Sequence, residues 1–515
     1  MPRRMLPIGI QTFRDLRERG CYYVDKTNYL ASLVAEGKHY FLSRPRRFGK
    51  SLLVDTLKEL FEGNEPLFRG TAIHDGWDWS VRRPVVRLDF SNGNFSVQGN
   101  LESNVMEQLA AAERRAGVAT EYETAPGRFA SLLETLAKEA GQAVAVLVDE
   151  YDKPMLDALD EPALARANRG FLRGLYSTIK FSDAHIAFTL FTGVTKFSKV
   201  SLFSDLNNLI DITLEGEYSA LCGYTDQDID TVFGDELPGL DRDAIRDWYN
   251  GYHWLGEERV YNPYDILLLF RRRRFGAYWF ETATPSFLVD TLLERGVATP
   301  DLDRMVGTEA LLSTFDIDRT STEALLFQTG YLTIKHEQTG DGRTRYRLGY
   351  PNREVRQSLN EHLLNALLPR TSSAVVQRSS LHDLLQANDF EGLESQLRAI
   401  FAAIPHQWHT RNEIASYEGY YASVVYSCFA AEGFDIVSED SSSRGRADMT
   451  IRYNGSVYVF EFKVVERDAE HTAIAQLRDR GYADKYRHLG VPIHLIGVEF
   501  SRAERNVAAF EVETA

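Results

Sequence analysis

Two short groups of residues in this sequence combine side chains suited to phosphate chemistry. The first is Gly49-Lys50-Ser51, which follows the apolar run HYFLS and precedes the amphipathic stretch LLVDTLKELF. A strand, a turn and a helix in this order present backbone N–H groups to phosphates at the helix N-terminus. We expect the backbone around Gly49 to wrap the phosphates, Lys50 to reach the β- and γ-phosphates, and the Ser51 hydroxyl to ligate Mg²⁺.

This loop departs from the common phosphate-binding pattern at one position. The pattern G-x-x-x-x-G-K-[ST] requires glycine at residue 44, where this chain has Arg44. Glycine there permits a positive φ angle and a close approach of the backbone to the ligand. We therefore expect the loop to take a different path or to tolerate strain, and a loop that is inert towards nucleotide stays an open alternative.

An acidic pair downstream favours the nucleotide hypothesis. In AVAVLVDEYDKP an apolar strand ends in Asp149-Glu150. At the C-terminal end of a buried parallel strand, Asp149 would hold Mg²⁺ through water and Glu150 would orient the attacking water as a base. Thr192 or Thr195, at the end of the next strand HIAFTLFTGVT, would sense the γ-phosphate. The plainer interpretation is a strand that ends in a solvated acidic turn.

The second group lies in the C-terminal stretch SRGRADMTIRYNGSVYVFEFKVV. Asp448 begins one strand, and Glu461 and Lys463 share a face of the next because side chains alternate along a strand. A hairpin turn at Asn454-Gly455 would bring Asp448 towards Glu461. Two carboxylates would then bind a hard divalent cation, preferably Mg²⁺, and Lys463 would orient or deprotonate a metal-bound water.

Two flanking helices carry polar side chains that could complete this second site. Glu418 begins one helical stretch and could reach the same metal ion, and Gln476 lies in another, where its amide could contact phosphate or the attacking water. The plainer interpretation is a sheet edge with solvated glutamate and lysine. However, two carboxylates and a lysine on one face would be costly to place together unless something charged binds there.

The elements that must position these groups divide the chain into three expected domains. A chain of 515 residues is too long for one hydrophobic core. Residues 1–215 alternate β-rich runs with helical patterns, as in a parallel sheet with helices on both faces. Residues 216–370 are helix-rich and end in a hairpin at Gly-Asp-Gly, which indicates a helical lid and a winged-helix-like module. Residues 371–515 form an α/β domain, and 371–380 is the expected linker.

Composition and charge restrict the classes of partner. The chain is 44% hydrophobic and 26% charged, as in a folded protein, and its three cysteines have no metal-ligand spacing. No stretch reaches the roughly 18 apolar residues of a membrane span and no signal peptide is apparent, so we expect a cytoplasmic protein without a membrane partner. A net charge of −16 argues against binding of nucleic acid through the overall charge of the protein. It does not argue against binding in a groove that is locally basic. The basic run at 271–274 is either a helix end or a phosphate contact.

Several stretches within residues 6–215 resemble the AAA-ATPase-like family found in bacteria beside PD-(D/E)XK nuclease domains. They are LPIGIQTFRDLRERGCYYVDKTNYL, SRPRRFGKSLL, VVRLDFS, VLVDEYDKPM and FTGVTKFSKVSLFSDLNNLIDIT, and the expected lid matches in WYNGYHW, VYNPYDIL and YWFETA. The family's own loop reads R-P-R-R-F-G-K-S, so Arg44 is in keeping with it. The resemblance implies a P-loop ATPase fold that binds Mg-ATP through Lys50, Ser51 and Asp149, with Glu150 as the base.

The same resemblance gives the two loop arginines a role, since Arg46 and Arg47 could stabilise charge on the phosphates. Their plainer function is to keep the loop soluble. An arginine supplied by a second copy of the chain cannot be located in one sequence, and a homo-oligomer therefore stays open.

Residues 405–505 resemble the PD-(D/E)XK nuclease superfamily, whose fold is that of α/β restriction endonucleases. The helix glutamate, strand aspartate, E-x-K strand and helix glutamine are all present. The main hypothesis is an ATP-gated, Mg²⁺-dependent nuclease that cleaves DNA, with RNA as the less favoured substrate. The alternative is a nucleotide-dependent switch whose nuclease-like domain binds nucleic acid or a protein partner without cleavage. A role in defence or in mobile-element upkeep is only an association at the level of the fold.

Overall fold

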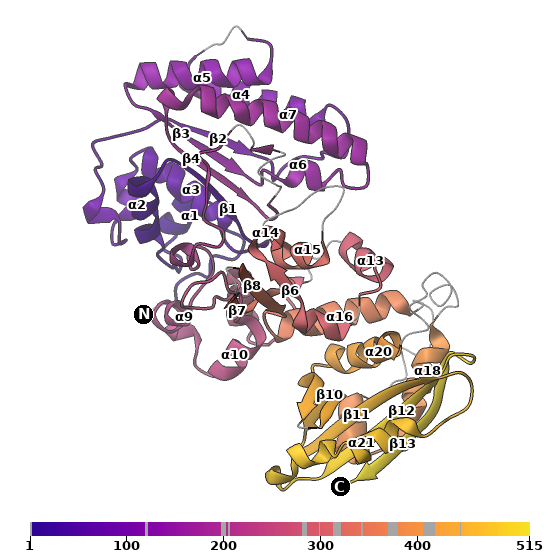
Figure 1. The fold of residues 1–515 in the computed structure, drawn as a ribbon. Coiled ribbons are helices and arrows are strands. Elements are labelled where there is room, and N and C mark those ends of the chain that lie inside the picture. The colour runs from indigo at the N-terminus through magenta and orange to yellow at the C-terminus, as the bar shows by residue number, and fades with distance from the viewer. Residues whose placement is uncertain are drawn as a thin grey trace. The chain divides into compact units, whose positions relative to one another are not determined.

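The computed structural model describes residues 3–118, 122–196, 202–203, 206–280, 286–297, 299–312, 321–340, 343–368, 380–404, 418–442 and 444–515. The chain packs into two compact units (Figure 1). The first unit comprises residues 1–279 and 305–352, and the second comprises residues 280–304 and 353–515.

A five-stranded parallel sheet forms the centre of the first unit, in the order β2-β3-β4-β1-β5. The strands are β1 (His39–Ser43), β2 (Val85–Asp89), β3 (Val144–Asp149), β4 (Ile186–Gly193) and β5 (Ile210–Asp211). Every residue of β1 and β3 is buried, as expected for strands covered on both faces. Because β4 lies between β1 and β3, the C-terminal ends of these three strands are neighbours.

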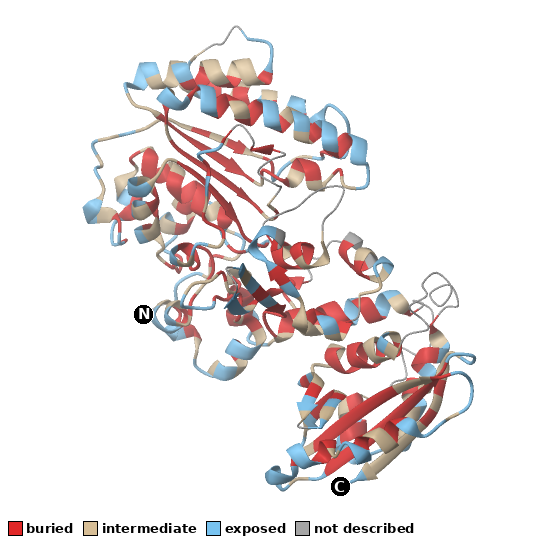
Figure 2. Cartoon of the chain, in the orientation of Figure 1, coloured by how far each residue is buried: buried red, intermediate tan, exposed pale blue. Residues whose placement is uncertain are grey.

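Helices cover both faces of this sheet, with α4, α5 and α7 on one side and α1, α2 and α3 on the other (Figure 1). Their buried residues face the sheet and their exposed residues face away (Figure 2). The helices are α1 (Phe13–Glu18), α2 (Thr27–Glu36), α3 (Lys50–Phe61), α4 (Asn100–Ala116), α5 (Ala125–Ala140), α6 (Lys153–Leu156) and α7 (Pro162–Phe181). Short 3-10 helices are η1 (Glu65–Phe68), η2 (His74–Gly76) and η3 (Asp183–His185).

Shorter elements complete the first unit. One group surrounds a core of aromatic and aliphatic side chains that also takes in Tyr22 and Val24 from the N-terminal segment. It contains η4 (Gly216–Tyr218), α9 (Asp226–Val232), η5 (Gly234–Glu236), α10 (Arg242–Tyr249) and α11 (Pro263–Arg272). The other group is a three-stranded sheet, in the order β6-β8-β7, with two helices. It contains β6 (Val306–Thr308), α14 (Glu309–Leu312), α15 (Thr322–Thr329), β7 (Thr333–Gly340) and β8 (Arg343–Gly349).

The second unit is built on a mixed sheet in the order β13-β12-β11-β10-β9. Its strands are β9 (Ile436–Ser442), β10 (Gly445–Tyr453), β11 (Ser456–Val465), β12 (Ile493–Ser501) and β13 (Asn506–Thr514). Only the β11–β12 pair is parallel among these described strands. One hydrophobic core joins this sheet to α17, α18 and α20, and a second joins it to α21 and η9.

The second unit contains helices that line these two cores and helices outside them. They are α13 (Ser286–Glu294), η6 (Thr299–Arg304), α16 (Arg353–Leu367), α17 (Leu381–Ala387), α18 (Phe390–Ala403), α20 (Glu418–Ala431), α21 (Thr472–Asp479), η9 (Tyr482–Lys485) and η10 (Arg487–Leu489). Figure 1 shows α20 and α21 with the strands β10 to β13.

The structure confirms the expected fold class, a parallel α/β sheet domain and a C-terminal mixed sheet domain. The hairpin expected from Gly-Asp-Gly is β7–β8, although residues 341–342 of its turn lie outside the described residues. Most of the expected linker, residues 371–379, also lies outside them. Residues of the segment 216–370 contribute to both units, and the domain boundaries at 215 and 370 stay predictions. Within the described ranges, no helix is long and apolar enough to cross a membrane.

Candidate functional sites

The first candidate site is the loop that joins β1 to α3. Its backbone is left-handed at Arg47, with a φ of 68°, and at Gly49, with a φ of 92°. Helix α3 begins directly afterwards, at Lys50. The backbone N–H groups of residues 46–49 donate to no acceptor in the described part of the chain. Free N–H groups in a turn directly before a helix N-terminus are the kind of donors that bind phosphate.

The Lys50 side chain is held by the same loop. Its Nζ atom donates to the carbonyl oxygens of Arg44, at 2.8 Å, and Pro45, at 3.0 Å. Burial lowers the pKa of Lys50, and the charges of Glu150 and Asp149 oppose this shift. Among the described residues, no carboxylate forms an ion pair with this ammonium group. Neutral carbonyls thus fix the position of a buried cation whose charge is left for an anion.

Arg44, at the position where the common pattern has glycine, is a buried structural residue. Its guanidinium donates to the carbonyl oxygens of Ser43, Thr213 and Tyr218 at 2.8, 2.9 and 3.1 Å. It also lies 4.2 Å from the centre of the Trp254 ring, and burial lowers its pKa to about 10. The positive φ angle falls on residue 47 rather than on Arg44, at a cost of about 1–2 kcal/mol for a side chain other than glycine.

Asp149 ends β3 and is completely buried. Thr192, near the end of β4, donates its hydroxyl to Asp149 Oδ1 at 2.7 Å, and Arg87 of β2 lies 3.5 Å from Oδ2. Within the described residues, Oδ2 accepts no hydrogen bond. Thr192 therefore orients the expected Mg²⁺ ligand, and its contact with a γ-phosphate stays a prediction. Sequence reasoning missed Arg87, although a charge inside the apolar run VVRLDF was a usable signal.

Two further carboxylates follow Asp149. Glu150 has a left-handed backbone, with a φ of 51°, and burial raises its pKa. Asp152 is buried, and its Oδ2 accepts hydrogen bonds from the backbone N–H of Thr195, at 2.6 Å, and from the Thr195 hydroxyl, at 2.7 Å. Thr195 thus holds Asp152, a residue that sequence reasoning passed over although it is the third acidic residue of DEYD.

The remaining residues proposed for this site lie at the loop and helix start. Ser51 is the second residue of α3 and is half-buried. The side chains of Arg46 and Arg47 are exposed, and the Arg47 guanidinium lies 4.9 Å from the centre of the Tyr264 ring. The Arg46 carbonyl accepts a hydrogen bond from Trp279 Nε1 at 3.0 Å. The expected roles of these three residues stay predictions.

The second candidate site is built on the β10–β11 hairpin. Asn454 and Gly455 form its turn with φ angles of 47° and 74°. The antiparallel ladder extends from this turn as far as Phe460 on β11. Beyond that pair, Asp448 inserts its carboxylate between the strands, and Oδ2 accepts a hydrogen bond from the backbone N–H of Phe462 at 2.7 Å.

Four of the proposed residues meet on one side of β11. Glu461 is 1% exposed, and its Oε1 accepts hydrogen bonds from Lys463 Nζ, at 2.9 Å, and from the Gln476 amide. Lys463 Nζ also lies 3.3 Å from Glu418 Oε1 at the start of α20. The second oxygen of Glu461, Oε2, is buried and has no hydrogen-bond partner among the described residues.

The two carboxylates on the β10–β11 hairpin, Asp448 and Glu461, have raised pKa values. Burial raises the pKa of Asp448 to about 6, although the Phe462 N–H and Lys463 oppose the shift. Burial and the nearby charge of Asp448 raise the pKa of Glu461 to about 7. Burial disfavours the charge on Lys463, but Glu461 and Glu418 together raise its pKa. One lysine thus compensates only part of the negative charge that these side chains would carry at neutral pH.

The approach of Gln476 depends on two residues of β12 that sequence reasoning missed. Gly497 pairs with Glu461, and a Cβ atom at Gly497 would lie 2.5 Å from the backbone nitrogen of Ile474 in α21. Glu499 is completely buried and accepts the backbone N–H groups of residues 470, 472 and 473 at the start of α21. Glycine and this capping carboxylate therefore set α21 against the sheet.

The oxygen atoms that the second site offers are of the kind that bind a divalent cation. Asp448 and Glu461 offer carboxylate oxygens, the ligands that Mg²⁺ prefers, and Glu461 Oε2 is buried without a partner. In the present arrangement, no three acidic, histidine or cysteine side chains of the described residues are grouped closely enough to hold a metal ion. The Lys463 ammonium lies between Glu461 and Glu418, so a cation held by all three carboxylates requires that this lysine moves.

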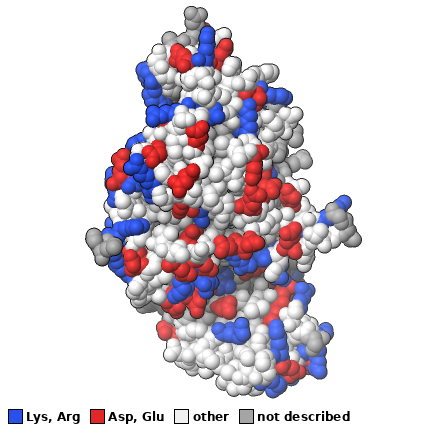
Figure 3. Space-filling model, turned by 90° about the vertical axis from the view of Figure 1, so that its left-hand side faces the viewer, with Lys and Arg blue, Asp and Glu red and all other residues white. Residues whose placement is uncertain are grey.

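The basic run at 271–274 starts in the last turn of α11, which ends at Arg272, and continues past the helix through the C-cap residue Arg273. Arg272 lies 4.9 Å from the centre of the Tyr278 ring, and Arg273 donates to the Glu236 carbonyl at 2.5 Å. These contacts agree with the interpretation as a helix end. On the face in Figure 3, acidic and basic side chains are interspersed, without one continuous basic surface.

Comparisons with known proteins match the two regions of the chain that contain these sites. Residues 7–203 match the model of a family described as a predicted AAA-ATPase, and residues 416–510 match a model of the PD-(D/E)XK nuclease superfamily. A protein of Azotobacter chroococcum mcd 1, called an uncharacterized protein in the vnfD 5' region, is 57% identical over 515 residues, which cover 100% of both chains.

Proposed function

We propose that this chain, which belongs to the AAA-ATPase-like family with a C-terminal PD-(D/E)XK nuclease superfamily domain, is a nucleotide-controlled nuclease. In this proposal the N-terminal site binds and hydrolyses Mg-ATP, and the C-terminal site cleaves phosphodiester bonds of nucleic acid, DNA rather than RNA, with Mg²⁺. The resident cofactors are thus ATP and Mg²⁺, and the partner is nucleic acid.

One observation carries the nuclease part of the proposal, namely the incomplete neutralisation of Glu461. A carboxylate that is 1% exposed, with one oxygen unpartnered and a pKa raised to about 7, is costly to bury. A cation bound to that oxygen and to Asp448 would remove this cost. It would also supply Lewis acid chemistry by polarising the scissile phosphate.

The other residues of the second site have separate tasks in this scheme. The Lys463 ammonium would orient the attacking water by donating a hydrogen bond to it, and it would accept a proton from that water only as the neutral amine, after loss of its own proton. Gln476 would orient Glu461 or contact the phosphate, and Glu418 would bind the cation from α20. These tasks follow from side-chain chemistry and from the contacts among the four residues.

At the first site, the free N–H groups of residues 46–49 and the Lys50 ammonium would bind the phosphates of ATP. Ser51 and Asp149 would hold the Mg²⁺ that accompanies ATP, and Arg46 would stabilise the phosphate charge. Glu150, whose pKa burial raises, would accept a proton from the attacking water. Arg47 would exchange its contact with Tyr264 for a phosphate contact.

The decisive experiment incubates the purified full-length protein with single- and double-stranded DNA and RNA, in Mg²⁺ or Mn²⁺, with and without ATP. We expect cleavage of DNA that requires the metal and that Asp448→Ala abolishes together with metal affinity. Glu466→Ala serves as the matched control, because Glu466 is an exposed acidic residue next to the same strand. No cleavage under any condition, together with unchanged metal affinity in Asp448→Ala, would favour the alternative of a binding switch.

The nucleotide half of the proposal has its own test. Lys50→Ala should weaken Mg-ATP binding roughly 10- to 150-fold, the equivalent of the ~1.5–3 kcal/mol of a charged hydrogen bond. Lys58→Ala in the same helix is the control, since Lys58 pairs with Glu59 and Glu62 near the C-terminal end of α3, away from the loop. Calorimetry that gives equal nucleotide affinity for wild type and Lys50→Ala would leave the nuclease with an inert P-loop.

A further inference from the structure

The three-stranded sheet of the first unit carries a row of arginines on its central strand. Arg343, Arg345 and Arg347 occupy alternate positions of β8, and all three side chains are exposed. Because successive side chains point to opposite faces of a strand, these three share one face at intervals of roughly 6.6–6.8 Å. Tyr346 and Leu348 alternate with them and are buried. The arginine row, residues 343, 345 and 347, therefore lies on the outer face of the sheet.

The side chains around the arginine row carry no negative charge. Directly paired residues of neighbouring strands lie on the same face of a sheet. The residues paired with Arg345 and Arg347 in the two flanking strands are Val306, Thr308, His336 and Gln338. Among the described residues of β6, β7 and β8, no carboxylate is thus located on the outer face.

The nearby acidic residues lie on the other face of the sheet. Glu337 pairs with Tyr346, whose side chain is buried on that face, and Glu309 directly follows β6. Burial raises the pKa of Tyr346, and the negative charges of Glu309 and Glu337 raise it further. The sheet therefore separates its charges, with cations on the outer face and carboxylates on the opposite one.

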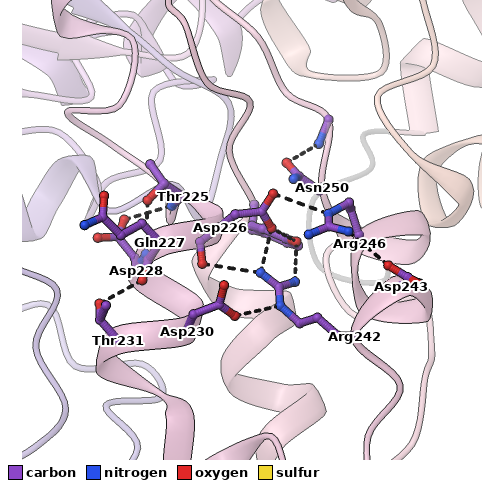
Figure 4. Close-up of polar contacts among 12 residues, drawn as sticks. Thr225, Asp226, Gln227, Asp228, Asp230, Thr231, Arg242, Asp243, Arg246 and Asn250 are labelled. Atoms are coloured by element: carbon purple, nitrogen blue, oxygen red, sulfur yellow. Dashed lines mark hydrogen bonds and ion pairs between the residues drawn. The ribbon is translucent and has the colours of Figure 1, made fainter.

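The arginine row also differs from other arginines of the first unit in having no partners. Figure 4 shows Arg242 in ion pairs with Asp226, at 2.6 Å, and Asp230, at 2.9 Å, and Arg246 in ion pairs with Asp226 and Asp243. In the described part of the chain, the guanidinium groups of the arginine row form neither an ion pair nor a hydrogen bond. In a protein of net charge −16, three adjacent unpaired cations indicate an anionic partner outside the chain.

A nucleic acid backbone matches the arginine row in charge and in spacing. The planar guanidinium group of arginine binds a phosphate group through two parallel N–H donors. Successive phosphates of one nucleic acid strand follow each other at nearly the same interval as alternate residues of a β-strand. The inner side of the sheet is packed around Ile334 and Leu348, which are 0% exposed, so the fold fixes the spacing of the row.

The helix that precedes β7 is not available for the same contact. Residues 324–328 of α15 are buried, and none of the described residues of this helix is exposed. A helix that enters the major groove must present side chains to the base edges. Contacts from this part of the protein therefore go to phosphates, which position a nucleic acid without reading its sequence.

We propose that the outer face of the β6-β8-β7 sheet holds the phosphate backbone of a nucleic acid strand through Arg343, Arg345 and Arg347. This inference rests on the proposed function, which makes nucleic acid the partner. It adds a binding surface in the unit that contains the phosphate loop, whereas the proposed nuclease site belongs to the second unit. The arginine row thus retains nucleic acid and takes no part in its cleavage.

The test measures binding of fluorescein-labelled duplex DNA to the full-length protein by fluorescence anisotropy, in a chelator that prevents cleavage and over a series of salt concentrations. For the variant Arg343→Gln/Arg345→Gln/Arg347→Gln, we expect an affinity at least roughly tenfold below that of wild type at about 0.1 M salt. The slope of log affinity against log salt concentration should become shallower by about 2.7, since each phosphate contact contributes about 0.9. Both effects should be equal for two unrelated DNA sequences.

Two further variants separate the charge of the arginine row from the fold and from the net charge. Arg→Lys at all three positions of the row keeps three cations and should retain the salt dependence of wild type. The variant Arg114→Gln/Arg115→Gln/Lys138→Gln removes the same number of charges from exposed positions near the C-terminal ends of α4 and α5. It should bind DNA with the affinity and the slope of wild type.

The failures of this inference and of the proposed function give different results. Equal affinity and equal slope for wild type and the glutamine variant of the arginine row would overturn the row as a nucleic acid contact. Nucleic acid binding elsewhere on the protein would then stand, and an acidic protein segment would be the occupant that fits the charge of the row. Absence of binding of labelled DNA and RNA by wild type would overturn the proposed function, and this inference with it.

Discussion

The two candidate sites differ in how far the protein itself satisfies their charged groups. At the phosphate loop, Lys50 is held by two carbonyl oxygens and Asp149 by Thr192 and by the Arg87 guanidinium, although Asp149 Oδ2 accepts no hydrogen bond among the described residues. At the hairpin, two carboxylates with pKa values raised to about 6 and 7 share one lysine, and Glu461 Oε2 has no partner in the described structure.

This difference separates two ways to prepare a site for a charged ligand. The loop offers backbone N–H groups, which carry no net charge, together with one buried lysine that carbonyl oxygens hold in place. The hairpin gathers ionisable side chains whose repulsion a cation relieves. We therefore expect changes at the loop to affect binding and stability together, and changes at the hairpin to abolish chemistry while the fold is retained or stabilised.

The largest expected effect concerns the carboxylate at the centre of the second site. Glu461→Ala should reduce metal-dependent cleavage by about a thousandfold or more, because it removes a metal ligand worth several kcal/mol in the transition state. Lys463→Ala should also slow cleavage but leave metal affinity largely intact. Rates under single-turnover conditions and metal titrations separate the two. Loss of metal affinity in Lys463→Ala and not in Glu461→Ala would reverse the assigned roles.

The second prediction restores the glycine of the common loop pattern. Arg44→Gly should destabilise the first unit by about 3 kcal/mol, because three buried carbonyl oxygens lose their donor. Arg46→Gly, in the same loop but exposed, should change the free energy of unfolding by less than about 1 kcal/mol. Urea denaturation measures both. A variant Arg44→Gly that was as stable as wild type and bound nucleotide more tightly would contradict this prediction. It would show that Arg44 does not stabilise the loop and that it weakens nucleotide binding.

The third prediction concerns coupling between the two activities. Glu150→Gln should keep ATP binding, stop ATP turnover and change the rate of nucleic acid cleavage by roughly 5- to 150-fold, the usual size of allosteric coupling. Glu161→Gln, at the start of α7, is the control for a charge change in the same unit. Identical cleavage rates without nucleotide, with ATP and with a non-hydrolysable analogue would mean that the sites work independently.

The smallest expected effect is a pH dependence of stability in the absence of metal. The pKa of Asp448 is about 6 in the folded protein, above the ~3.9 of an unfolded chain, so the folded state binds its proton more tightly. The free energy of unfolding should therefore fall as the pH rises from about 4 to 6. Asp448→Asn should remove this decrease in the free energy of unfolding. The variant should be about 1–2 kcal/mol more stable than wild type at pH 8, after allowance for solvent screening.

Thermal or urea unfolding in a chelator at pH 4 and pH 8 tests this prediction. Near pH 4 the free energy of unfolding of Asp448→Asn and that of wild type should differ little. At that pH the wild-type carboxyl is protonated and therefore uncharged, like the amide of asparagine. A variant that is less stable than wild type at pH 8 would show that Asp448 is held by favourable contacts and not by the need for a cation.

Much of this architecture could be read from local sequence patterns. The β-rich runs and helical stretches predicted the parallel sheet domain, and Asn454-Gly455 predicted the hairpin turn, because both depend on residues close together in the chain. Period-two alternation likewise places Phe462 in the core, opposite to Glu461. The roles of the proposed site residues stay predictions.

The sequence by itself determined which side chains are present and which of them share a strand or a turn. Only the tertiary structure decided their partners, because Arg44 finds its carbonyls at residues 213 and 218, and Asp149 finds Arg87 on another strand. The close approach of α21 at Gly497 has the same origin. Such contacts join segments that are distant in the sequence, and their geometry is fixed by packing of the whole unit, which no local pattern encodes.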